Sequence, residues 1–67
     1  MPAAAIQLAT VIGPKAAGVV VVETIAWMAG HFGLSFDVTL AAILDGGAAA
    51  EKFTQLIGVA AAGFAEA

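Results

Sequence analysis

The stretch GHFGLSFD at residues 30–37 is the strongest interruption in the chain, because it separates two long alanine-rich segments. Gly30 or Gly33 can end a helix in the left-handed conformation. Ser35 or Asp37 can cap the next helix, and Asp37 also places a negative charge where the helix dipole favours one. The sequence therefore predicts an all-α fold. We expect a single antiparallel helical hairpin over residues 1–67, with a helix at about 3–30, a turn at about 31–36 and a helix at about 37–65.

Two positions inside the predicted helices disfavour straight continuous helices. Pro14 lacks a backbone N–H and crowds the carbonyl of Thr10, which kinks or breaks a helix. Gly46 and Gly47 loosen the second helix, because glycine has a high conformational freedom that disfavours a helix interior. The sequence is thus compatible with two long kinked helices or with four shorter ones. A strand over GVVVV at residues 18–22 is less favoured, because no partner strand is evident in a chain dominated by alanine.

Length and composition indicate that this chain associates with itself or with lipid. A domain of 67 residues buries only a modest part of its surface, and small domains usually need disulfides, a metal or oligomerisation. There is no cysteine and one histidine, which excludes disulfides and clusters of several histidines. Hydrophobic residues make up 63% of the chain and charged residues 10%, so a monomer cannot cover itself with polar groups. Oligomerisation therefore remains as the way in which so small a chain can be stabilised.

Other classes of function find little support in the sequence. The net charge of −3 is unlike the basic surfaces of most nucleic-acid-binding domains. The uncharged runs 1–14, 24–36 and 53–65 are each shorter than the about 20 apolar residues of a membrane span. The N-terminal segment also lacks the basic start of a signal peptide. His31 and Ser35 are separated by a glycine turn and do not form a catalytic pair, so we expect no enzyme. With one histidine and no cysteine, we also expect no metal site and no cofactor.

Small residues recur every four positions in both predicted helices, and such rows lie along one ridge of a helix surface. Ridges of this kind let a second backbone approach closely, as in membrane helices. We therefore expect them to pack within the hairpin or between subunits. The rows consist of Ala5, Ala9, Gly13 and Ala17 in the first helix, and of Ala42, Gly46, Ala50, Thr54, Gly58 and Ala62 in the second.

Lys15 and Lys52 are the only basic residues apart from His31. A hairpin folded at residue 34 would place the two lysines at nearly the same height, with Glu51 beside them. They can pair with acidic residues, extend their ammonium groups to water or contact phosphates of nucleic acid or lipid. Ion pairing is the simplest of the three, because an unpaired buried charge is very costly.

Two local resemblances involve membrane-associated peptides. The segment VIGPKAAGVVVVETIAWMAG resembles the pilins of conjugative and type IV secretion pili, in which a Gly-Pro pair precedes a W-M-x-G motif. This resemblance implies an extracellular pilus subunit that binds lipid, although Asp45, Glu51 and Lys52 interrupt the second helix. The segment IAWMAGHFGL resembles the circular bacteriocins of low charge, which implies a membrane-active peptide.

A third resemblance covers the whole chain and rests on size, composition and the predicted hairpin. The chain resembles the major coat protein of the bacilliform archaeal viruses (Clavaviridae), whose small hydrophobic hairpin subunits enclose double-stranded DNA in a rod. The absence of asparagine and cysteine suits a thermophile. This resemblance implies a capsid protein of the virion, a homopolymer assembled as a helical filament or rod. It also implies sequence-independent phosphate contacts from Lys15 and Lys52. We take it as the leading hypothesis, ahead of the pilin and the bacteriocin.

Overall fold

The computed structural model describes residues 3–66, and this part of the chain forms four α-helices and no strand. The helices are α1 (Ala3–Ile12), α2 (Pro14–Phe32), α3 (Phe36–Asp45) and α4 (Ala48–Glu66). The prediction of an all-α fold is therefore confirmed. The expectation of two continuous helices at about 3–30 and 37–65 is corrected, because each is divided in two, as the alternative of four shorter helices allowed.

Glycines in conformations with positive φ make both divisions. Gly13 has φ 90° and ψ 153°, and Pro14 then occupies the first position of α2, where its missing N–H costs nothing. Gly46 has φ 91° and ψ 179°, and Gly47 follows with φ 93°. Residues with a Cβ rarely adopt such angles, so helical hydrogen bonding stops at these glycines.

The turn between α2 and α3 is shorter than the predicted range of residues 31–36. Gly33 adopts the left-handed conformation with φ 68°, and the Leu34 amide donates to the Ala29 carbonyl at 2.9 Å, which closes α2. Ser35 caps α3, because its hydroxyl accepts from the Val38 amide at 3.2 Å. Of the predicted turn residues, only Gly33 lies in the turn. Gly30 belongs to α2, and Asp37 lies in the first turn of α3.

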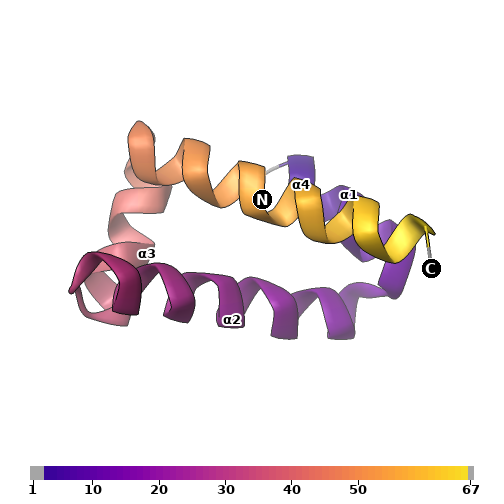
Figure 1. The fold of residues 1–67 in the computed structure, drawn as a ribbon, viewed down its shortest axis with the longest axis horizontal. Coiled ribbons are helices and arrows are strands. Elements are labelled where there is room, and N and C mark those ends of the chain that lie inside the picture. The colour runs from indigo at the N-terminus through magenta and orange to yellow at the C-terminus, as the bar shows by residue number, and fades with distance from the viewer. Residues whose placement is uncertain (1–2, 67) are drawn as a thin grey trace.

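The four helices form an elongated U whose open end is filled by α1. Figure 1 shows α2 and α4 as two arms that run in opposite directions, with α3 crossing between them at one end. The chain bends by 105° from α2 into α3. At the other end α1 folds back and packs against both arms, most extensively against α4. The molecule measures 32 × 19 × 17 Å.

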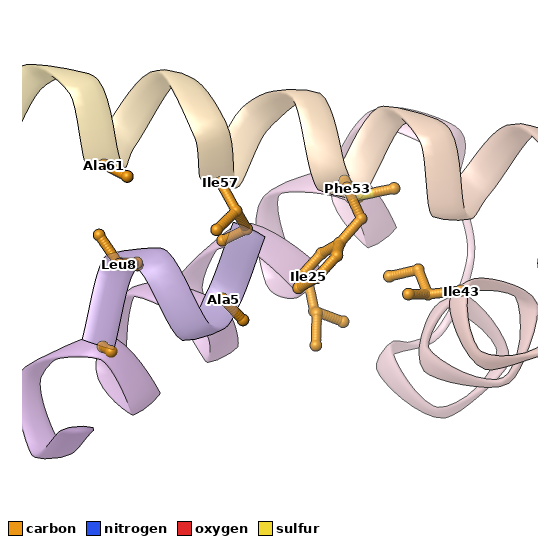
Figure 2. Packing of buried hydrophobic residues seen from close by; sticks show 9 residues of the cluster. Ala5, Leu8, Ile25, Ile43, Phe53, Ile57 and Ala61 are labelled. Atoms are coloured by element: carbon orange, nitrogen blue, oxygen red, sulfur yellow. The ribbon is translucent and has the colours of Figure 1, made fainter. Parts of the chain in front are cut away.

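One small core joins all four helices. Leu8 and Ala5 of α1 lie against Ala61 and Ile57 of α4, while Phe53 of α4 points toward Ile25 of α2 (Figure 2). Ile43 of α3 completes the cluster at the crossing end. The most completely buried large side chains are those of Leu8, Met28 and Ile57, each with 0% exposure.

Buried polar groups are few, and the helices themselves satisfy them. Thr39 is 2% exposed, and its hydroxyl donates to the Ser35 carbonyl at 2.9 Å. Thr24 donates in the same way to the Val20 carbonyl at 2.7 Å. No buried side-chain nitrogen or oxygen among the described residues lacks a hydrogen-bond partner. These bonds to the preceding turn remove the cost of burying a hydroxyl without holding the helices together.

Candidate functional site

The surface of this molecule is unusually apolar for so small a chain. Twelve of the described large hydrophobic side chains are at least 37% exposed, and they occur on all four helices and in the turn. They are Ile6, Val11, Val19, Val22, Trp27, Phe32, Leu34, Phe36, Val38, Leu44, Val59 and Phe64. Exposure on this scale is typical of a surface that contacts protein or lipid. The largest exposed fractions are those of Leu44, at 77%, and Val59, at 68%.

The first predicted row of small residues lies inside the molecule. Ala5 and Ala17 are buried in the core, and Ala9 packs against it. Gly13 sits at the sharp bend between α1 and α2, so the row is not one continuous ridge. The row instead lets α1 fold closely onto α2 and α4. Packing within one chain was one of the two expectations for these residues, and Ala5, Ala9 and Ala17 take part in the packing of this chain's own core.

The second row of small residues lies mostly on the outside. Ala50, Thr54, Gly58 and Ala62 of α4 are exposed or half-buried, and they line two shallow surface depressions. A Cβ atom added to Gly58 would meet no described atom within 4 Å, so a side chain or a neighbouring backbone has room at this position. This α4 row is accessible to a neighbouring molecule. The row does not extend into α3 as one ridge, because Gly46 lies at the bend and separates Ala42 from Ala50.

The structure does not bring the two lysines to the same height. Lys15 is the second residue of α2 and Lys52 the fifth residue of α4, and these helices start at opposite ends of the molecule (Figure 1). The predicted register about residue 34 is wrong because α3 crosses between the arms and is not part of either. Lys15 is exposed and Lys52 is half-buried. A single copy therefore presents two separate positive charges.

Charged side chains take no part in the side-chain hydrogen bonds recorded for residues 3–66. All four of these bonds involve the hydroxyls of Thr10, Thr24, Ser35 and Thr39. The carboxylates of Glu23, Asp37, Asp45 and Glu51 are exposed. The described residues also contain no group of three or more side chains arranged to hold a metal ion.

Aromatic side chains gather at the end of α2. The Trp27 and His31 rings stack with centroids 4.9 Å apart and an interplanar angle of 8°. Phe32 meets His31 edge to face, with the centroids 5.0 Å apart. The Trp27 and Phe32 side chains are each about half exposed, at 53% and 51%. His31 was expected in the turn at about 31–36, whereas it lies in α2 and forms part of this exposed stack.

A second group of exposed residues follows the outer face of α2, and of its members only Lys15 was predicted as a site residue. Lys15, Val19, Glu23 and Trp27 are spaced four residues apart and all are exposed, so they form one ridge. The four-residue spacing was visible in the sequence. The sequence does not show which side of α2 the other helices cover, and so it does not identify this ridge as exposed.

Within residues 3–66 no single helix has the length and apolar character of a membrane span. The pair α2 and α3 has both when the two helices are taken together, but the chain bends by 105° between them. The features of this molecule that can bind a partner are its apolar surface, the accessible α4 row of small residues, and the two separated cations Lys15 and Lys52. No family model, curated protein or solved structure matches the chain.

Proposed function

We propose that this chain is a structural subunit that assembles with many copies of itself into a helical filament or rod. The observation that carries the proposal is the exposure of twelve large apolar side chains among the residues that the structure describes. Burying such a surface against identical copies removes it from water, and contacts between different faces propagate when the rotation between copies does not close. In this assembly the arms α2 and α4 act as the hairpin of the subunit, and the α4 row of small residues lets a neighbouring backbone approach closely.

We further propose that the assembly is a viral coat, with this chain as the major coat protein of a rod-shaped virion that encloses double-stranded DNA. This step is supported by the resemblance in size, composition and helical layout to the coat proteins of bacilliform archaeal viruses. Lys15 and Lys52 are the candidates for phosphate contacts, made without reading the bases. Because five acidic residues outnumber the two lysines, this proposal requires the carboxylates to face away from the DNA.

The test is the ratio of absorbance at 260 and 280 nm of the purified native particle, before and after treatment with nuclease and with detergent. A nucleic-acid signal that resists nuclease in the intact particle is the expected result. Electron microscopy of the same sample should show rods. A spectrum of protein alone, from particles that remain filamentous, would overturn the coat proposal while leaving self-assembly intact.

The second candidate is a pilus subunit with bound lipid, outside the cell. The observation that favours it is the bent pair α2 and α3, which together reach the length and apolar character of a membrane segment. Phospholipid released by detergent from a filament without nucleic acid would support the pilin. Small particles that permeabilise vesicles and never form filaments would instead indicate the third candidate, a membrane-active bacteriocin.

A further inference from the structure

The outer face of α2 carries an ordered pattern of charge, of which the proposed function uses only Lys15, as a candidate phosphate contact. Lys15 and Glu23 lie four residues before and four residues after Val19. All three side chains are exposed, and that of Val19 is 56% exposed. One ridge therefore has a cation at one end, an apolar centre and an anion at the other end.

This pattern is complementary to a reversed copy of itself. When a second α2 packs antiparallel with Val19 near the two-fold axis, Lys15 of each copy faces Glu23 of the other, and both ion pairs form at once. A parallel arrangement would bring like charges together. An antiparallel register centred on Glu23 would face two carboxylates, which is also repulsive. The register about Val19 is the one that pairs both charges.

The surroundings of the ridge permit close approach of a second helix. The adjacent row on α2 consists of Gly18, Val22, Ala26 and Gly30, and a Cβ added at either glycine would meet nothing within 4 Å. Three of these four residues are glycine or alanine, so they leave room beside the ridge for a second helix, and Val22 is the only large side chain in the row. Two helices cross at about −50° when a ridge of residues four apart on one helix fits beside the corresponding ridge of the other. At this angle the two ridges run alongside each other.

We propose that the outer face of α2 is a self-association surface that binds the same face of a second copy through reciprocal Lys15–Glu23 ion pairs across Val19. Lipid is a poorer occupant, because acyl chains would leave both charges without partners. The proposal rests on the self-association part of the proposed function and not on DNA. It assigns Lys15 to a protein contact, and it leaves Lys52 as the candidate for phosphate.

Charge reversal tests the pairing. Lys15→Glu and Glu23→Lys should each weaken dimerisation in analytical ultracentrifugation by about tenfold or more, because each variant brings two like-charged pairs together. The double variant exchanges the two charges and should recover most of the affinity. Asp45→Lys is the matched control, since it changes the net charge as Glu23→Lys does but lies at the exposed end of α3, outside both proposed contact surfaces. Equal effects of Glu23→Lys and Asp45→Lys, or no recovery in the double variant, would overturn the proposal.

Cross-linking tests the register without relying on affinity. The chain has no cysteine, so Val19→Cys introduces a single thiol that lies near its own copy across the axis. Oxidation should give a disulfide-linked dimer, whereas Val59→Cys, at a position 68% exposed on α4, should give much less. Filaments that form while Val19→Cys stays unlinked would refute this contact but not the proposed function. Linked dimers from a chain that never forms filaments would refute the filament but not this contact.

Discussion

At the scale of single residues, stability is concentrated in a few side chains. Leu8, Met28 and Ile57 are fully buried, although most large apolar residues in the chain retain some exposure. A core this small has little redundancy, so each of its members accounts for a large share of the stability. Exposed apolar residues on the same helices contribute far less to the free energy of unfolding, and in the proposed assembly they stabilise contacts between copies.

Ile57 and Val59 provide a matched comparison, because they lie two residues apart on α4 with exposures of 0% and 68%. We expect Ile57→Val to lower the free energy of unfolding by about 1 kcal/mol and Ile57→Ala by about 2–4 kcal/mol. Val59→Ala should change it by less than about 0.5 kcal/mol. Urea titration followed by circular dichroism at a fixed protein concentration measures all three. Similar losses at both positions would contradict the core assignment.

At the scale of elements, the helix ends are determined by local chemistry. Ser35 starts α3 with its hydroxyl, and Gly33 ends α2 in the left-handed conformation. The sequence offered each as one of two candidates, Gly30 or Gly33 for the end of α2 and Ser35 or Asp37 for the cap of α3, because capping depends on neighbours within a few positions. The stacked rings of Trp27 and His31 were not predicted. They depend on α2 continuing through Phe32, beyond its expected end.

The cap at Ser35 can be tested by replacing its hydroxyl. Ser35→Ala removes the acceptor of the Val38 amide and should lower the free energy of unfolding by about 1 kcal/mol. Ser35→Asp keeps an acceptor at the same position and should retain most of the stability. Thermal unfolding of the two variants against the parent chain is the measurement. Equal losses in both variants would show that the cap does not stabilise α3.

The bend at Gly46 separates two helices that the sequence allowed to be one. Gly46→Ala places a Cβ at φ 91° and should cost about 1–3 kcal/mol. The control is Gly58→Ala inside α4, which should stabilise the chain by about 0.5–1 kcal/mol because alanine favours a helix and the site has room. Circular dichroism and denaturant titration report both. A rise in helicity without loss of stability in Gly46→Ala would instead support one continuous second helix.

At the scale of the whole molecule, folding and association are linked. A compact unit of 32 × 19 × 17 Å with this much exposed apolar surface should be stabilised by binding other copies. We expect the midpoint of thermal unfolding to rise with protein concentration, because assembly favours the folded state by mass action. Val19→Asp should reduce this dependence more than Val59→Asp does. A midpoint independent of concentration in all three proteins would contradict assembly.

The sequence by itself determined the helical class, the main turn and the positions where helices can break. Alanine-rich segments, Pro14, the Gly46–Gly47 pair and the capping residues act within a few positions along the chain, so their effects can be worked out without tertiary contacts. The exposed apolar surface was also foreseeable, because a chain that is 63% hydrophobic cannot bury all of it within 67 residues. The hairpin, the filament and the DNA contacts stay predictions.

Only the tertiary structure decided how strongly each break bends the chain. The relative positions of residues on different helices depend on those bends. Because α3 crosses between the arms and α1 folds back onto α4, Lys15 and Lys52 lie far apart, and Ala5 lies beside Ile57 (Figure 2). The same packing buries the first row of small residues and exposes the second. Spacing along a helix identifies which residues share a face, but the face that becomes the surface depends on packing against helices distant in the sequence.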